Sequence, residues 1–207
     1  MVLGKGSGAK VKNKKKEKIK MKKMIIAACA IALAGLTQAA TVGWGYAGAI
    51  SNADAKGSAY AFFIIGQNGV TSEAQIADMV AAGTDVSAYA FGSGTTTANG
   101  IVNQAAASSG KTIEITGNTT LEGFMVVFND ATVADATKFL VIGNDDCGTV
   151  NGYKKTLNAS STTALFAAGN VANYVNNTAN WQDIPEPTSG LLLLLGVAGL
   201  ALRRRRA

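Results

Sequence analysis

Histidine is absent from this chain of 207 residues, and there are only two cysteines, Cys29 and Cys147. Without histidine, the chain cannot form imidazole-based catalytic dyads or triads, or histidine-ligated metal sites. It also lacks the side chain best suited to proton transfer near neutral pH. No histidine is present to activate the Cys147 thiol, so we expect a buried or loop cysteine that is not a nucleophile.

Proline is also scarce, and both prolines lie close to the C-terminus, at Pro185 and Pro187. Each lacks an N–H and disfavours helical geometry in the preceding residue, so the chain is predicted to be extended or turned here. Leu191 to Leu202 follow without a charged or polar side chain, and Arg203 to Arg206 come directly after them. A helix that is apolar on every face must be buried in protein or in lipid.

The apolar run has two interpretations. As a helix, its twelve residues span roughly 18 Å against about 30 Å of bilayer hydrocarbon, which favours a buried helix of a soluble domain. The four consecutive arginines instead favour a membrane stop on the cytoplasmic side, since their long side chains can reach the interface. We favour membrane insertion.

In order, a Pro-Glu-Pro turn, an apolar segment and an arginine cluster resemble the PEP-CTERM sorting signal of Gram-negative surface proteins, which exosortase enzymes recognise and cut. The resemblance covers residues 185–207. It implies export, transient insertion in the inner membrane, and a final place at the cell surface or in an exopolysaccharide matrix. The implied partners are the secretion machinery and an exosortase. The implied site residues are Pro185, Glu186 and Pro187 for recognition, and Arg203, Arg204, Arg205 and Arg206 for the cytoplasmic stop.

The N-terminal part predicts a second processing event. Residues 1–20 are dense in lysine, which is typical of a solvated tail or a nucleic-acid patch. We interpret them as a misassigned upstream extension, because a ribosome-binding sequence can be encoded just before the second methionine. Residues 21–39 then form a secretory signal peptide with cleavage between Ala39 and Ala40. A lipoprotein anchor at Cys29 is the alternative, which the apolar run continuing past Cys29 disfavours.

The remaining residues, 40–184, carry five lysines, no arginine and eleven acidic residues, a formal net charge of −6. The basic character of the chain therefore belongs to its two ends. Binding to nucleic acid needs a basic face for phosphate contacts, so we expect no nucleic-acid partner. The length suits one domain with one core, and a single cysteine allows no internal disulfide.

Strand patterns dominate this domain. Residues 59–65, 121–128 and 139–142 are apolar at successive positions, as expected of central strands buried on both faces. Residues 111–116 alternate between apolar and polar side chains, which is typical of an outer strand with one buried face. Weaker strand candidates are residues 42–46, 86–91, 164–167 and 181–184.

One helix is predicted over residues 73–82, capped by Ser72 and ended by Gly83. A short turn is expected between residues 130 and 137. Two polar loops are predicted, residues 92–110 and 168–180. The expected fold class is mainly β, an antiparallel β-sandwich-like domain with one short helix.

Three sets of side chains could form a binding or catalytic site, and each set also has a purely structural explanation. Calcium ligands can be drawn from Asn144, Asp145 and Asp146 with Asp130 or Asp135. Such residues also form turns with their own backbone. A carboxylate pair for glycoside hydrolysis can be drawn from Glu114, Glu122, Asp130 and Asp135, as it can in any acidic protein.

The third set is aromatic. Rings that can stack on a sugar face are Trp44, Tyr46, Tyr89, Tyr174 and Trp181. We favour the structural explanation, in which the two tryptophans pin terminal strands to the core. The sequence therefore predicts a non-enzymatic surface or matrix protein without a cofactor. The alternatives are a carbohydrate-binding module, with extracellular polysaccharide as its partner, and a glycoside hydrolase that uses carboxylates alone.

Overall fold

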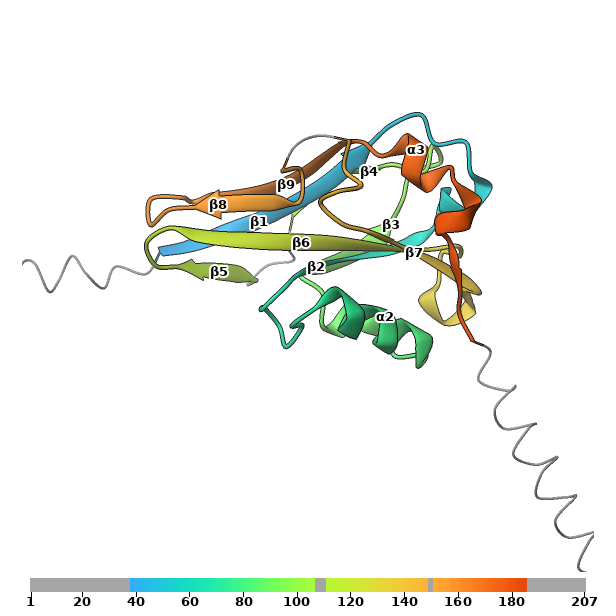
Figure 1. Cartoon of the computed structure of the whole chain (residues 1–207), viewed down its shortest axis with the longest axis horizontal. Coiled ribbons are helices and arrows are strands. Elements are labelled where there is room, and N and C mark those ends of the chain that lie inside the picture. Colours follow the sequence, from blue (N-terminus) through green and yellow to red (C-terminus); the bar gives the residue numbers. More distant parts are fainter. Residues whose placement is uncertain (1–37, 107–110, 149–150, 186–207) are drawn as a thin grey trace, which may run out of the picture.

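A computed structural model of the protein describes residues 38–106, 111–148 and 151–185. Ten strands in these residues form two sheets (Figure 1). The predicted upstream extension, nearly all of the signal peptide, and the predicted tail from Glu186 onward lie outside the described residues. The prediction of a mainly β fold with antiparallel pairing is confirmed, with the exception of one parallel pair.

The first sheet is built around β1 (Gln38–Ala47). Along one edge of β1, β4 (Val102–Ala106) and β5 (Thr112–Ile115) pair antiparallel, one after the other. Along the other edge, β9 (Thr163–Asn170) pairs in parallel. This parallel pair corrects the expectation of antiparallel strands throughout. The alternation of side chains along a strand sets its faces but does not specify the direction of its neighbour.

The second sheet has the strand order β10-β7-β6-β2-β3, and β8 pairs with the first half of β6. Its strands are β2 (Ala59–Ile64), β3 (Gly92–Thr95), β6 (Thr119–Phe128), β7 (Lys138–Ile142), β8 (Lys154–Leu157) and β10 (Gln182–Asp183). All pairings within this sheet are antiparallel.

The two sheets share a core of buried side chains. Trp44 of β1 stacks on Phe62 of β2 with ring centroids 5.2 Å apart, and Phe166 of β9 lies 5.5 Å from the same ring. The other face of the second sheet is covered by α2 (Glu73–Ala81), whose Ile76 and Val80 pack in a second cluster. Strands β2 and β7, and β6 from residue 123 onward, are therefore buried on both faces, as their apolar runs predict.

The predicted helix cap and stop are confirmed. The hydroxyl oxygen of Ser72 accepts a hydrogen bond from the N–H of Gln75 at 3.2 Å, which satisfies one of the free donors of the first turn. Gly83 follows the helix with a φ of 69°, in the left-handed region that favours glycine. Short 3-10 helices occur at η1 (Ala53–Ala55), η2 (Val86–Ala88), η3 (Val133–Asp135) and η4 (Thr178–Asn180). Of these, η3 confirms the turn expected between residues 130 and 137.

Three local predictions are wrong. Residues 92–110 are not simply a loop, because β3 and β4 lie within them and pair with β2 and β1. Residues 86–91 do not form a strand, because the Asp85 carboxylate accepts the N–H of Ser87 at 3.0 Å and starts η2. The predicted single helix has a companion within the polar stretch 168–180, α3 (Ala172–Val175), where the Asn170 side chain accepts the N–H of Ala172 at 2.9 Å.

The two ends of the described domain lie far apart. In Figure 1, the start of β1 lies at the end of the molecule where β5 and β8 are found, and the segment after β10 leaves at the opposite end. The predicted signal-peptide cleavage between Ala39 and Ala40 falls inside β1, whose first residues pair with β5. Cleavage there stays a prediction, and it would leave most of β1 in the sheet.

Candidate functional site

The C-terminal end of the domain is fastened into the second sheet up to the residue before the Pro-Glu-Pro sequence. Strand β10 pairs with β7 through Gln182 opposite Phe139 and Asp183 opposite Lys138. The N–H of Ile184 donates to the carbonyl of Thr137 at 2.7 Å. Ile184 also packs against the cluster under α2. The folded domain therefore reaches Ile184, and Pro185 follows without a linker.

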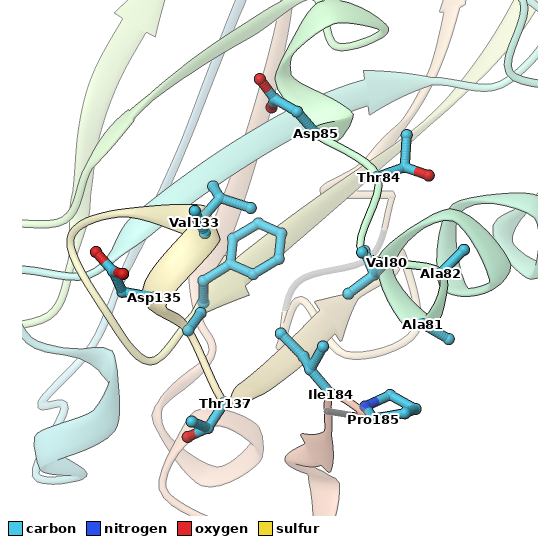
Figure 2. A pocket seen from close by; sticks show the side chains of 14 residues that line it. Val80, Ala81, Ala82, Thr84, Asp85, Val133, Asp135, Thr137, Ile184 and Pro185 are labelled. Carbon is cyan, nitrogen blue, oxygen red and sulfur yellow. The ribbon is translucent and has the colours of Figure 1, made fainter. Parts of the chain in front are cut away.

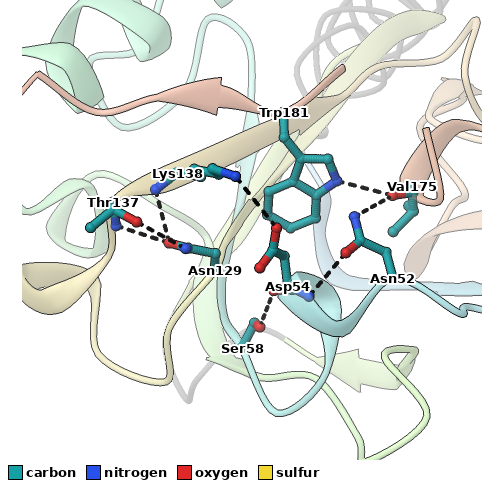
Figure 3. A network of polar contacts seen from close by, with 8 residues as sticks. All are labelled: Asn52, Asp54, Ser58, Asn129, Thr137, Lys138, Val175 and Trp181. Carbon is teal, nitrogen blue, oxygen red and sulfur yellow. Dashed lines mark hydrogen bonds and ion pairs between the residues drawn. The ribbon is translucent and has the colours of Figure 1, made fainter. Parts of the chain in front are cut away.

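Trp181 anchors the chain directly before β10. Its indole N–H donates to the carbonyl of Val175 at 2.9 Å, and its side chain is 8% exposed (Figure 3). The side-chain amide of Asn52 donates to the same carbonyl at 3.2 Å. The nearby ion pair between Lys138 and Asp54, at 3.9 Å, joins partly exposed side chains and contributes little. The anchor is therefore the buried ring and its hydrogen bond.

A single asparagine closes the loop that precedes β7. The side-chain oxygen of Asn129 accepts the N–H groups of Thr137 and Lys138, at 2.9 and 2.8 Å (Figure 3). Its side-chain nitrogen donates to the hydroxyl of Thr137 at 3.0 Å. Three hydrogen bonds from one side chain thus hold the two ends of residues 130–137 together.

Replacing Asn129 with alanine is expected to destabilise the domain by about 1–2 kcal/mol, because two backbone N–H groups lose their protein acceptor and water can replace it only in part. Urea unfolding measures the change, and hydrogen exchange at Thr137 and Lys138 should accelerate. Asn173→Ala is the control, since Asn173 is exposed on α3. Equal, small effects of the two substitutions would contradict this role of Asn129.

Directly beside Pro185 lies a groove of about 600 Å³, which we call the junction groove (Figure 2). It lies between the C-terminal end of α2, η3 with its flanking loop, and the end of the chain at Ile184 and Pro185. Its apolar floor includes Val80 and Phe128, which are buried, and the half-buried Val133. The groove thus adjoins the start of the C-terminal motif.

The carboxylates proposed for glycoside hydrolysis are spread over the domain. Glu114 is exposed on β5 and Glu122 is exposed on β6. Asp130 and Asp135 flank or end η3, which lies at the opposite end of the molecule from β5 (Figure 1). Asp130 accepts the N–H of Thr132 at 2.9 Å. The four residues therefore do not form one site.

The residues proposed for calcium are used in a turn. The side-chain oxygen of Asn144 accepts the N–H of Tyr153 at 3.2 Å, and Asp146 accepts the N–H of Gly143 at 2.9 Å. In the described part of the chain, no group of three or more aspartate, glutamate or cysteine side chains is placed to hold a metal ion. The turn explanation of this sequence is therefore supported.

An acidic neighbourhood that the sequence did not predict surrounds Asp146. Burial, and then the charges of Asp146 and Glu122, raise the pKa of Glu73. Burial raises the pKa of Asp146, against a lowering effect of the hydrogen bond from Gly143. Burial and the nearby Asp146 and Glu73 raise the pKa of Tyr174 to about 12. These residues come from four distant parts of the chain, so no local pattern groups them.

The aromatic side chains settle the choice between sugar platforms and core residues. Trp44 is 1% exposed, Tyr46 is 3% exposed and Trp181 is 8% exposed. Tyr174 is half-buried, and Tyr89 is 41% exposed. The prediction that both tryptophans pin terminal strands to the core is confirmed. A carbohydrate-binding surface built on these tryptophans is therefore contradicted.

Cys147 is a buried free thiol, as predicted. Its Sγ donates to the carbonyl of Gly143 at 3.0 Å. Burial raises the pKa of the Cys147 thiol to about 12, so the thiol is neutral at physiological pH and is a poor nucleophile. Burial likewise raises the pKa of Tyr46 and Tyr153.

These shifts predict a stability that is constant through neutral pH and falls in alkali. The unfolded chain releases protons from cysteine and tyrosine above about pH 8.5–10, whereas the folded domain holds Cys147 protonated until about pH 12. Above about pH 9 the free energy of unfolding should fall by about 1.4 kcal/mol per pH unit for Cys147, and each buried tyrosine should add a similar slope only above about pH 10. Urea unfolding between pH 7 and 10.5 measures this slope, and Cys147→Ala should delay its onset. An unfolding free energy that stays constant up to pH 10.5 would contradict the prediction.

Comparison with known proteins identifies the segment that begins at this junction. Residues 183–206 match the family model of the PEP-CTERM protein-sorting motif. The match starts within β10 and continues through the Pro-Glu-Pro sequence, the apolar run and the arginines. No curated protein and no solved structure matches the chain. Among the described residues, no helix has the length and hydropathy needed to cross a membrane.

Proposed function

We infer from the sorting motif that the protein is exported and sorted toward the cell surface by an exosortase. We propose that residues 40–184 form a sandwich-like domain with a non-enzymatic structural or interaction role at the surface or in the extracellular matrix. The observation that carries the proposal is the motif match at residues 183–206, placed where the folded domain ends.

Two features of the domain support this role. Residues 40–184 carry a formal net charge of −6, which favours solubility after both basic ends are removed. The ends predicted to be processed leave the domain at opposite sides of the molecule (Figure 1). Removal of the signal peptide and removal of the tail therefore do not compete for one surface.

The experiment compares the full chain with a variant that ends at Ile184, both with the intact N-terminal region, in the native host. We expect the processed product of the full chain at the cell surface or in the medium. We expect the truncated chain in the periplasm. A strain without exosortase should accumulate the unprocessed full chain. Equal surface display of both chains would contradict the proposal.

A further inference from the structure

We propose that the junction groove is a docking surface for the enzyme that processes the Pro-Glu-Pro motif, and that it receives an apolar segment of that enzyme. This inference rests on the proposed function, because it requires that the tail is processed at the motif. It goes further by assigning part of the recognition to the folded domain.

The first argument is position. Ile184 is bonded to Thr137, and Pro185 is itself part of the groove wall. An extended chain advances about 3.5 Å per residue, so three residues of chain reach at most roughly 10 Å beyond Ile184. An enzyme that holds the motif in its active site is therefore brought close to the groove.

The second argument is the chemistry of the groove. Its volume of about 600 Å³ lies within the range of ligand-binding pockets, about 300–1,000 Å³. Over the buried floor, the small side chains of Ala81, Ala82 and Ala134 are exposed and leave room for an incoming side chain. A concave apolar surface of this kind is typical of interaction sites.

The third argument is that the walls are already ordered. At the end of α2, the N–H of Ala82 donates to the carbonyl of Asp78 at 2.9 Å, and the N–H of Thr84 donates to Met79 at 2.9 Å. On the opposite wall, Asn129 closes the loop that carries η3. A preformed surface loses little conformational entropy on binding.

The rim indicates the charge of the partner. Asp85 and Asp135 both line the groove and are exposed. Hydrogen bonds from the hydroxyl and N–H of Ser87 lower the pKa of Asp85, so this carboxylate is ionised at neutral pH. We expect the docking segment to be apolar and flanked by lysine or arginine.

The test uses exposed alanines, so that the fold is preserved. Ala82→Glu with Ala134→Glu fills the groove and adds charge, whereas Ala74→Glu with Ala88→Glu places the same charges on exposed positions of α2 and η2 outside it. The full chain of each variant is produced in the native host, and the processed fraction is followed over time by mass. We expect the control to be processed like wild type and the groove variant about tenfold more slowly, which corresponds to roughly 1.4 kcal/mol of lost binding. Thermal unfolding checks that both variants remain folded.

Each other outcome overturns the inference. Processing of the folded groove variant at the wild-type rate would show that the motif alone is recognised, and the proposed function would stand. Faster processing would mean that the tail of the same chain occupies the groove. Loss of the unprocessed groove variant from the membrane fraction would assign the groove to lipid. Absence of processing in the wild type would overturn both the proposed function and the docking surface.

A flexible insertion provides an independent check. A short glycine and serine linker between Ile184 and Pro185 separates the motif from the groove. If the groove docks the enzyme, the linker should slow processing, and filling the groove should then have a smaller additional effect. A linker that accelerates processing would instead show that the domain only obstructs access.

Discussion

Replacing Trp44 with alanine is expected to lower the free energy of unfolding by about 3–5 kcal/mol, the usual cost of deleting a large buried aromatic side chain. Trp44 is 1% exposed and stacks on Phe62 with centroids 5.2 Å apart. It lies at the contact between the two sheets, and its removal leaves a cavity that rigid strands cannot close. Because native domains are stable by only about 5–15 kcal/mol, this loss is a large fraction of the total stability.

The measurement is urea unfolding followed by circular dichroism. Trp44→Phe should cost less than Trp44→Ala, because part of the ring and of its contact with Phe62 is kept. Tyr89→Ala is the control, since Tyr89 is 41% exposed, and it should change stability by less than about 0.5 kcal/mol. A folded Trp44→Ala variant with wild-type stability would show that the ring does not hold the sheets together.

Gly92→Ala should strongly destabilise the domain, with an expected loss of about 3 kcal/mol. A Cβ at position 92 would overlap the Cη2 and Cζ2 atoms of Trp44. Because that ring is stacked and buried, it cannot move aside without breaking core contacts. The glycine in β3 is therefore required by the tryptophan in β1.

The prediction has an internal test. In a Trp44→Phe background the outer ring is absent, so Gly92→Ala should cost much less than it does beside tryptophan, and the two substitutions should be strongly non-additive. Ser93→Ala is the matched control, because Ser93 is exposed on the same strand. Additive effects of Gly92→Ala and Trp44→Phe would contradict the contact between these residues.

The close packing of Gly92 against Trp44 also explains why the sequence predicts a loop over residues 92–110. Their glycine, serine and threonine composition is typical of loops. In β3, however, the residue at position 92 has to be glycine because the ring of Trp44 lies directly against it. The requirement comes from a residue that is distant in sequence. Conversely, the apolar runs of β2, β6 and β7 predicted burial on both faces because each run carries that information locally.

The candidate site likewise has one part that can be predicted from the sequence and one part that cannot. The Pro-Glu-Pro sequence, the apolar run and the arginines are contiguous, so the sorting signal can be predicted from the sequence alone, and the family match confirms it. The junction groove combines the end of α2, η3 and Ile184, which only the folded chain brings together. Polar residues such as Asn129 gave no signal, because asparagine is common in turns whether or not it closes one.

The central claim is that the chain is cut at its sorting motif and delivers a folded domain to the cell surface. It is tested most directly by the intact mass of the protein from native cells, fractionated into envelope and medium. The claim predicts a species that begins at Ala40 and ends between Pro185 and Pro187, alone or with an added group, in the surface or medium fraction. A species that keeps Leu191 to Ala207 and remains in the inner membrane would contradict it.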